Sequence, residues 1–188
     1  MNRQPYLEAV RDRVIVFDGA FGTFVQDLDL GPADFGGDSL EGCNEMLCLT
    51  RPDVIESMHR AFLDVGVDVI ETASFGSFST VLVEYNIPEK AYELNVAAAA
   101  IARRVADTYE VDGRPRYVAG SIGPGTKLPS LGHIDFATLR DSYEEQARGL
   151  LDGGSDLFLI ETCMDLLQIK AAMQACRRAM KSIGREVP

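Results

Sequence analysis

Short apolar runs alternate with longer helix-like patterns along the whole sequence. Four runs stand out, at residues 14–17, 67–70, 117–119 and 157–160. They are continuous or nearly so rather than alternating with polar residues, which is typical of strands covered on both faces. Strands that alternate with helices predict an α/β fold with a parallel sheet and right-handed crossovers.

Helical periodicity fills the intervals between these runs. We expect helices over residues 53–65, 88–109, 135–153 and 165–184. Thr50 and Asp53 form a possible capping box for the first helix, and Pro52 suits its first turn. Asp135 is expected to begin the third helix and Gly153 to end it in a left-handed conformation. The fourth helix, which begins at Asp165 and ends at Gly184, carries a predicted core stripe of Leu166, Ile169, Met173, Cys176 and Met180.

The sequence also repeats itself weakly. Residues 64–72 resemble residues 152–162, because both read helix end, glycine turn, aspartate, apolar strand and then Glu-Thr. Alternate strands of a (β/α) barrel fill the same interior layers. Two strands with the same exit chemistry, two units apart, therefore indicate a barrel built from repeats.

The length limits how much of such a barrel is present. A complete (β/α)8 TIM barrel typically needs about 250 residues, whereas four βα units already occupy nearly all 188 residues. The sequence ends at residues 185–188, where we expect a fifth strand to begin. We therefore predict a half-barrel of the first four units, with residues 1–188 as one domain and no second domain. The glycine-rich segment 31–49 is predicted to be either a long functional loop or an arm over the barrel mouth.

Charge and cysteine content narrow the function classes. The chain has 18 Lys and Arg against 29 Asp and Glu, a net charge of -11, which argues against nucleic acid or an anionic membrane as a partner. No run approaches 18 consecutive apolar residues, so no membrane span is expected. The four cysteines match neither a disulfide-dense domain nor a paired CxxC zinc site, so we expect a cytoplasmic protein.

Three carboxylates follow the predicted strands. Asp18, Glu71 and Glu161 each lie at a strand exit, and ligands bind at the carboxyl ends of parallel strands. Crowded carboxylates raise one another's pKa unless a cation is present, so a bound ammonium group or metal ion is the natural candidate. The alternative is that Asp18 caps its turn and the two glutamates bind loop amides.

Glycines at the same strand exits could hold an anion. Gly19, Gly22, Gly123 and Gly125 allow close backbone approach, and exposed amides can bind a carboxylate or phosphate. Taken one at a time, these glycines are better explained by ordinary tight turns. Neither GxGxxG nor GxxxxGK[ST] occurs, so nucleotide binding is poorly supported.

The histidines and cysteines are weaker candidates. His59 is expected to be a partly exposed helix residue, and His133 is either a ligand or proton shuttle or simply a solvated loop residue. Cys163 could face the barrel mouth as a thiol or be buried and inert. Cys43 and Cys48 lack partner ligands for a metal.

Five motifs in order resemble one known family. They are Asp-Gly-Ala-Phe-Gly-Thr at 18–23, Gly-Cys-Asn-Glu at 42–45 ahead of Leu-Thr-Arg-Pro at 49–52, Ile-Glu-Thr at 70–72, Gly-Ser-Ile-Gly-Pro at 120–124 and Leu-Ile-Glu-Thr at 159–162. Together they resemble the homocysteine-binding domain of the homocysteine S-methyltransferase family, most of all its cobalamin-dependent members. Ala73-Ser74 departs from the Asn-Thr that this family commonly has there.

The resemblance implies a (β/α)8 barrel that binds homocysteine at its mouth. Asp18 and Glu161 would hold the amino group, the amides near Gly19 and Ala20 would meet the carboxylate, and Thr72 would complete the substrate contacts. This agrees with the expectation from the residues alone. Acids that favour a cation and backbone amides that favour an anion, placed together, suit the zwitterion of a free amino acid.

The resemblance also implies cofactors and partners. Members of the family activate the homocysteine thiol with zinc held by three cysteines, and the cobalamin-dependent ones take the methyl group from methylcobalamin on another module. None of the four cysteines matches the zinc positions, so we expect no catalytic or metal residue here and little activity from this chain alone. The expected partners are the remaining barrel half with the cobalamin module, or a second copy of the chain. Betaine or S-methylmethionine as donor, and a non-catalytic half-barrel for binding or assembly, remain alternatives.

Overall fold

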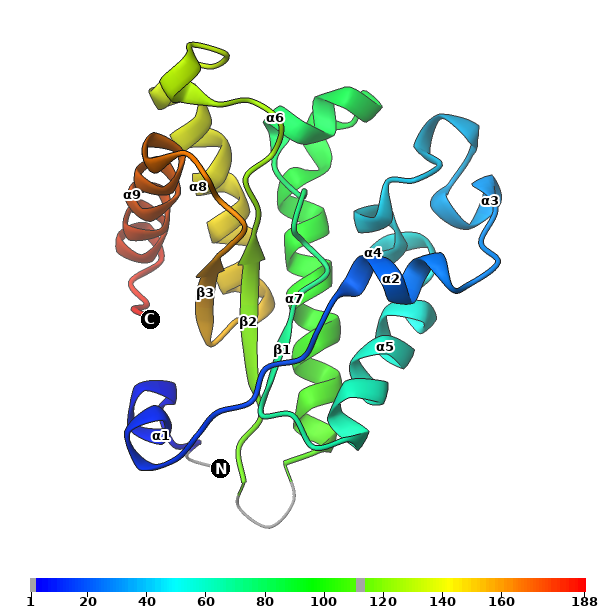
Figure 1. The fold of residues 1–188 in the computed structure, drawn as a ribbon, viewed down its shortest axis with the longest axis vertical. Helices are drawn as coiled ribbons and strands as arrows, with labels where there is room; N and C mark the ends of the chain where they lie inside the picture. Colours follow the sequence, from blue (N-terminus) through cyan, green and yellow to red (C-terminus); the bar gives the residue numbers. More distant parts are fainter. Residues whose placement is uncertain (1–2, 111–113) are drawn as a thin grey trace.

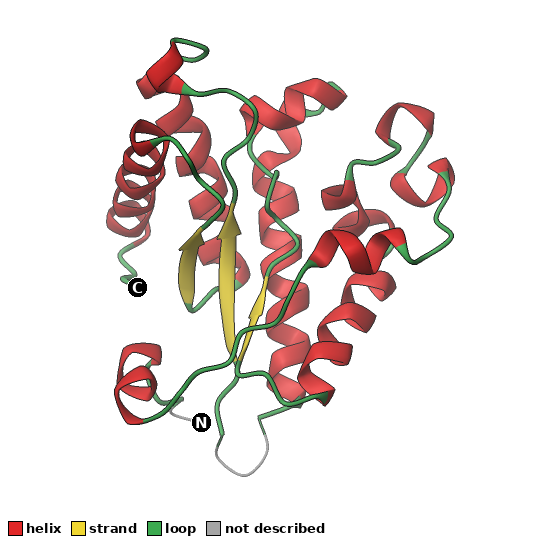
Figure 2. Ribbon diagram, viewed as in Figure 1, coloured by secondary structure: helices red, strands yellow, loops and turns green. Residues whose placement is uncertain are grey.

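A parallel sheet forms the centre of the molecule (Figures 1 and 2). The computed structural model describes residues 3–110 and 114–188. The sheet has three strands in the order β1 (Val69–Glu71), β2 (Tyr117–Ile122) and β3 (Leu157–Ile160). Val69 lies opposite Tyr117, and Ala119 lies opposite Leu157. Strands that follow one another in sequence are therefore neighbours in space, which confirms the predicted α/β fold with a parallel sheet.

The first predicted strand, residues 14–17, pairs less than we expected. Phe17 forms a single parallel bridge with Val69, and Val16 O accepts hydrogen bonds from Asp68 N and Val69 N. Val14 is 83% exposed and Val16 50% exposed, because no described strand lies on the other side of this segment. The segment therefore occupies the position of a strand beside β1 without forming a ladder.

Helices and short 3-10 turns make up most of the rest of the chain. The helices are α1 (Tyr6–Asp12), α2 (Phe21–Gln26), α3 (Pro32–Phe35), α4 (Leu47–Thr50), α5 (Pro52–Asp64), α6 (Ser79–Leu82), α7 (Ala91–Thr108), α8 (Phe136–Gly153) and α9 (Leu166–Ile183). The 3-10 turns are η1 (Asp38–Leu40), η2 (Asn44–Met46), η3 (Val83–Tyr85), η4 (Pro88–Lys90) and η5 (Pro129–Leu131). None of these described helices has both the length and the apolar composition needed to span a bilayer.

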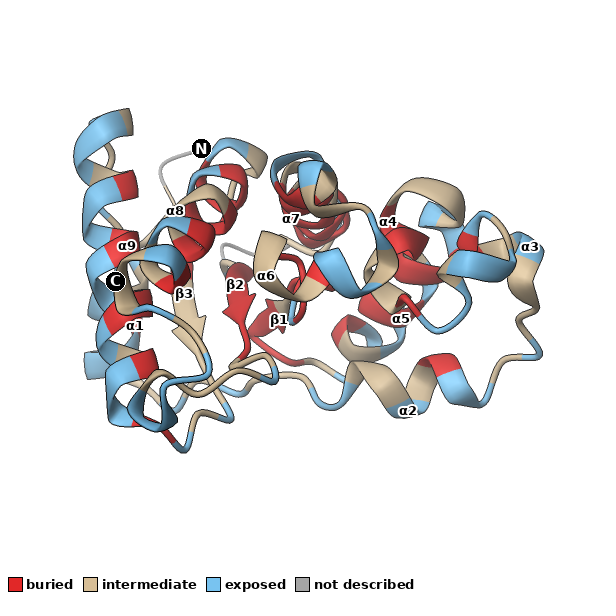
Figure 3. Cartoon of the chain, turned by 90° about the horizontal axis from the view of Figure 1, so that it is seen from above, coloured by how far each residue is buried: buried red, intermediate tan, exposed pale blue. Residues whose placement is uncertain are grey.

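The four long helices pack in sequence order along the sheet. Helix α5 contacts α7, α7 contacts α8, and α8 contacts α9. In Figure 3 the buried residues gather on β1, β2 and the sides of α7 and α8 that face the sheet, whereas much of α9 is exposed. Successive βα units packed side by side are what a barrel wall requires.

The helix boundaries follow the predictions closely, with two corrections. Asp135 and Asp165 cap α8 and α9 by accepting hydrogen bonds from amides of the first turn. The predicted capping box of α5 is wrong, because Thr50 Oγ1 donates to Met46 O instead and α5 has no side-chain cap. The left-handed stop of α8 is Gly154, with a φ of 105°, rather than Gly153.

Gly153 instead lies at the contact between α8 and α7. A Cβ atom at this position would be 2.6 Å from both Ala99 Cβ and Val96 O. Gly149, one turn earlier, is equally confined, since its Cβ would be 2.8 Å from Tyr92 O. Glycine is therefore present at these two positions because the helix backbones approach closely.

The predicted core stripe of α9 is only partly correct. Leu166 is 73% exposed and Met173 43% exposed, whereas Cys176 is buried and Met180 packs against the core. The fully buried residues of α9 are mostly small: Ala171, Ala172, Ala175 and Ala179. Because alanines allow α9 to lie close to α8, α9 buries its alanine face rather than the stripe of larger apolar residues.

Segment 31–49 is folded rather than an open loop. It contains α3, η1, η2 and α4, and its Phe35, Leu47 and Cys48 are buried in one cluster with Ile55 of α5 and Ala98 of α7. The segment is thus compact and helical, and it packs on α5 and α7.

The internal repeat has an atomic counterpart at the start of the strands. Asp68 N donates to Val16 O while Val16 N donates to Asp68 Oδ2. In the same way, Asp156 N donates to Val118 O at 2.8 Å and Val118 N donates to Asp156 Oδ2 at 2.8 Å. Each aspartate therefore closes a ring with the preceding strand segment and fixes its register.

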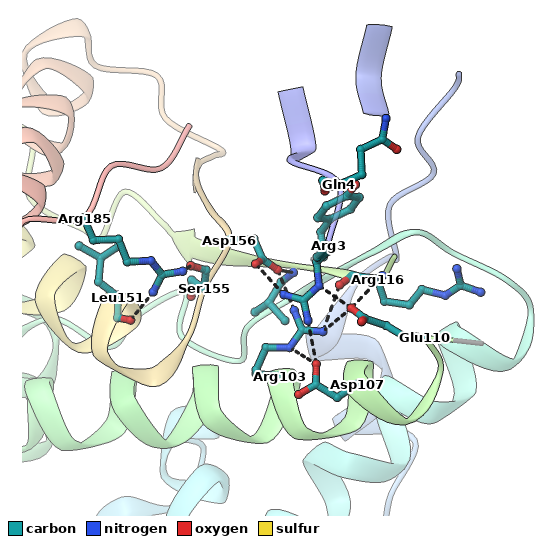
Figure 4. Close-up of polar contacts among 12 residues, drawn as sticks. Arg3, Gln4, Arg103, Asp107, Glu110, Arg116, Leu151, Ser155, Asp156 and Arg185 are labelled. Carbon is teal, nitrogen blue, oxygen red and sulfur yellow. Dashed lines mark hydrogen bonds and ion pairs between the residues drawn. The ribbon is translucent and has the colours of Figure 1, made fainter. Parts of the chain in front are cut away.

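Arginines neutralise the strand-entry aspartate Asp156 (Figure 4). Arg3 and Arg103 both bind Asp156, and both also reach Asp107 and Glu110. The network ties the amino-terminal segment to α7 and to the start of β3. Helix α1, which the sequence analysis did not predict, lies beside it and packs on the amino ends of the strands.

Candidate functional site

One cavity of about 460 Å³ opens at the carboxyl ends of the strands. All five predicted substrate-binding residues line it: Asp18, Gly19, Ala20, Thr72 and Glu161. Glu71, the third strand-exit acid, lines it as well. The structure thus brings the predicted residues together, and their role in binding a ligand stays a prediction.

The two carboxylate oxygens of Asp18 differ in their contacts. Its Oδ2 accepts a hydrogen bond of 2.9 Å from Glu71 N, whereas its Oδ1 is buried with no hydrogen-bond partner among the described residues. Burial raises the pKa of Asp18 to about 8, opposed by the bond from Glu71 N and helped by the charges of Glu71 and Glu161. A buried carboxylate oxygen without a donor is stabilised most by a cation that donates hydrogen bonds.

Glu71 and Glu161 lie beside each other in the same cavity. Burial, followed by the charge of Glu161 and a hydrogen bond with it, raises the pKa of Glu71 to about 7. Glu161 Oε1 accepts a hydrogen bond of 2.5 Å from Ser121 Oγ. None of the described residues lining the cavity is lysine, arginine or histidine, so the electrostatics favour a positively charged ligand.

Thr72 lines the cavity, but its hydroxyl is engaged within the protein. Its Oγ1 accepts a hydrogen bond from Ser121 N at 3.0 Å and lies 2.6 Å from Ser74 Oγ. Thr162, after Glu161, adopts a φ of 57°, an uncommon conformation for a β-branched residue. Strained backbone of this kind often accompanies functional sites.

The sequence analysis missed several residues of the cavity wall. Asn44 and Glu45 come from η2, and Met58 and Phe75 add apolar surface. Half-buried Glu45 accepts a hydrogen bond of 2.8 Å from Gly76 N, and a Cβ on Gly76 would lie 2.7 Å from Glu45 Oε1. The Gly-Cys-Asn-Glu motif was visible in the sequence, but nothing in its spacing connected it to a strand exit.

The histidines lie elsewhere. His59 is completely buried, contrary to the expected partial exposure, and neither ring nitrogen has a hydrogen-bond partner in residues 3–110 and 114–188. Burial lowers the pKa of His59 to about 3. His133 Nδ1 accepts a weak hydrogen bond from Leu128 N in its own loop and does not line the cavity.

The described residues do not fit a zinc site. No group of three His, Cys, Asp or Glu side chains among them could hold a metal ion. Burial raises the pKa of the Cys43 and Cys176 thiols to about 12, whereas zinc binds the thiolate. Cys163 is half-buried and its Sγ contacts Glu161 O at 3.1 Å, outside the cavity lining.

Fold and cavity together define a class of protein. Parallel strands, each followed by a helix and ending at one acidic cavity, characterise α/β proteins that bind ligands at the carboxyl ends of their strands. The family model for homocysteine S-methyltransferase matches residues 15–187. The chain belongs to the homocysteine S-methyltransferase family, which confirms the resemblance seen in the sequence.

Curated relatives extend far beyond this chain. It is 51% identical over 182 residues to methionine synthase of Mycobacterium leprae and 52% identical to methionine synthase of Mycobacterium tuberculosis. These matches cover 97% of this chain but 15% of either relative.

Solved structures support the fold. The chain is similar to the homocysteine methyltransferase MmuM from Escherichia coli, with a TM-score of 0.73 for the oxidised form and 0.74 for the metallated form. The sequence identities are 21% and 22%, and the matches cover 95% of this chain and 62% and 63% of those chains.

Proposed function

We propose that this chain supplies the amino-acid-binding part of a methionine-forming homocysteine S-methyltransferase. The complete enzyme would transfer a methyl group from methylcobalamin to the thiolate of zinc-bound homocysteine. Family membership and the methionine synthase relatives support the reaction. The observation that carries the binding role is the unpartnered, buried Oδ1 of Asp18 in the same cavity as Glu161.

In this proposal the cavity recognises the charged end of the amino acid. The α-ammonium group has three N–H donors, which suit Asp18 Oδ1 and the carboxylate of Glu161. The backbone amides of Gly19 and Ala20 would donate to the α-carboxylate. Met58 and Phe75 would pack against the aliphatic part of the ligand and exclude water from the ion pairs.

The reactive end of homocysteine depends on other parts of the complete enzyme. When bound, zinc would supply a deprotonated thiol, and methylcobalamin would supply the methyl group. Since the described residues do not fit zinc, we propose that the metal ligands and the cobalamin module lie outside this chain. We therefore expect the isolated chain to turn over little or no homocysteine, and turnover at a normal enzymatic rate would contradict this.

We further propose that the βα units of this chain form one half of a (β/α)8 barrel. The neighbour order of the strands, the bridge between Phe17 and Val69 and the partial coverage of the Escherichia coli structures support this arrangement. The remaining half of the barrel, or a second copy of the chain, would be the partner. The unpaired state of all four cysteines supports a cytoplasmic location.

Calorimetric titration tests the binding role. L-Homocysteine should bind the purified chain, whereas its analogue without the amino group, 4-sulfanylbutanoate, should bind at least tenfold more weakly because it leaves Asp18 Oδ1 unpaired. Asp18→Asn and Glu161→Gln should weaken homocysteine binding, and Asp29→Asn, at an exposed aspartate outside the cavity, should not. Equal affinity for the two ligands would contradict the proposal.

A further inference from the structure

Buried hydroxyl groups connect the cavity to the interior of the sheet. Thr72 and Ser74 lie at the exit of β1, and Ser121 lies within β2. All three are at least nine-tenths buried, with exposures of 4%, 0% and 2%. Their hydrogen bonds form a closed ring across the two neighbouring strand ends.

The direction of each hydrogen bond in this ring follows from the available protons. Ser74 Oγ donates its single proton to Ser121 O at 2.8 Å. Its contact of 2.6 Å with Thr72 Oγ1 therefore uses the proton of Thr72. Ser121 N completes the ring by donating to Thr72 Oγ1 at 3.0 Å. Thr72 consequently has no hydroxyl proton left for a ligand in the cavity.

Helix α8 holds the same ring from the other side. The side chain of Gln146 is completely buried, and its Nε2 donates to Ser74 O at 2.7 Å and to Ser121 O at 3.4 Å. Both strand exits are thus attached to one helix. The backbone of Ser121 is fixed by three partners, namely Thr72, Ser74 and Gln146.

The ring uses the backbone of Ser121 and leaves its hydroxyl free to form a hydrogen bond in the cavity. Ser121 lines the cavity, and its Oγ donates to Glu161 Oε1 at 2.5 Å. Its proton has no other acceptor among the described residues. Glu161 Oε2 lies 3.4 Å from Thr162 Oγ1, and the carboxyl group of Glu71 also interacts with Glu161. Ser121 therefore fixes one oxygen of the Glu161 carboxylate, while an ammonium group bound between Glu161 and Glu71 would relieve the repulsion between these two acids.

We propose that Ser121 is the positioning residue of the ammonium site: it orients the Glu161 carboxylate, and the ring of Thr72, Ser74 and Gln146 holds Ser121 in place. This inference rests on the proposed function, because it assigns Ser121 to the site that would bind the amino group of homocysteine. It also gives Thr72 an indirect role in place of the substrate contact expected from the sequence.

Calorimetric titration of the whole chain with L-homocysteine tests this inference. Ser121→Ala should weaken binding about tenfold, the effect of losing one hydrogen bond to a charged group. Ser121→Thr retains the hydroxyl and should recover most of the affinity. Ser142→Ala is the matched control, because Ser142 is also a buried serine but bonds Ser79 and Thr80 away from the cavity.

A double substitution separates positioning from a general structural effect. If Ser121 acts through Glu161, adding Ser121→Ala to Glu161→Ala, which removes the acceptor of the Ser121 hydroxyl, should cause less than a twofold further loss of affinity. Tenfold losses that multiply in the double variant, or a Ser121→Ala variant that binds like the unmodified chain, would overturn the positioning role while the proposed function stands. If the unmodified chain fails to bind L-homocysteine, the proposed function fails, and the inference that rests on it fails too.

Discussion

Asp18 makes the stability of the protein depend on pH. Because its pKa is raised to about 8, the folded protein keeps a proton that the unfolded chain releases above about pH 4. The folded state then binds more protons than the unfolded state, so this residue lowers the free energy of unfolding as the pH rises from about 4 to about 8.

Asp18→Asn should therefore stabilise the chain at alkaline pH. Asparagine keeps an acceptor for Glu71 N but carries no charge. We expect the free energy of unfolding of the variant to exceed that of the unmodified protein by roughly 2 kcal/mol at pH 9 and to be nearly the same near pH 4. Urea unfolding at both pH values measures this, with Asp29→Asn as the control. Parallel stability profiles of Asp18→Asn and the unmodified chain would show that Asp18 titrates normally.

At the residue scale, the sequence located the acids but not their surroundings. Asp18 and Glu161 follow apolar runs, and that position alone predicted that they meet. The orphaned Oδ1 of Asp18 and the hydrogen bond from Ser121 to Glu161 depend on side-chain contacts between separate strands. His59 lies four residues from Ile55 and four from Leu63, both buried, and this spacing could have predicted its burial.

At the element scale, the strand-entry aspartates tie each strand to the one before it. The side chain of Asp156 is 16% exposed and accepts hydrogen bonds from Val118 N and from the guanidinium groups of Arg3 and Arg103. The side chain of Asp107 binds the same two arginines but is 53% exposed. Removing one partner of a buried charge pair lowers the free energy of unfolding more than removing one partner of an exposed pair does.

Asp156→Ala should therefore destabilise the chain by about 3 kcal/mol, and Asp107→Ala by less than about 1 kcal/mol. Chemical denaturation at neutral pH compares the two variants with the unmodified chain. If both substitutions lower the free energy of unfolding equally, the ion pairs with the arginines would account for the whole effect. The hydrogen-bonded ring between Asp156 and Val118 would then contribute nothing.

The contact between α7 and α8 provides a second test at this scale. Gly153→Ala places a methyl group 2.6 Å from Ala99 Cβ, so we expect a net loss of about 1–3 kcal/mol despite the better helix propensity of alanine. Gly22→Ala is the matched control, since Gly22 lies in α2 with nothing within 4 Å of the added Cβ. Thermal unfolding should show a lower midpoint for Gly153→Ala and an unchanged or higher one for Gly22→Ala.

Helical elements were the most predictable part of the fold. Their apolar period and, for α8 and α9, their aspartate caps are local signals, so α5, α7, α8 and α9 begin and end within a few residues of expectation. The face that α9 buries was not predictable in the same way. Its sequence contains two stripes at helical spacing, and the fit against α8 selects the alanines over Leu166 and Met173.

At the scale of the whole molecule, strand order follows from sequence order. β1, β2 and β3 pair in parallel and in sequence order, which brings their carboxyl ends to one edge of the sheet. This is why five residues spread from Asp18 to Glu161 line one cavity. The weak pairing of residues 14–17 could not be predicted, since a run of apolar residues does not reveal which side of it has a partner.

The most direct test of the account is a crystal structure of this chain with reduced L-homocysteine. We predict that the amino nitrogen lies within hydrogen-bond distance of Asp18 Oδ1 and of the Glu161 oxygen not bound by Ser121. A ligand bound with its amino group away from both carboxylates, or a saturated crystal whose cavity holds no amino acid, would contradict the account.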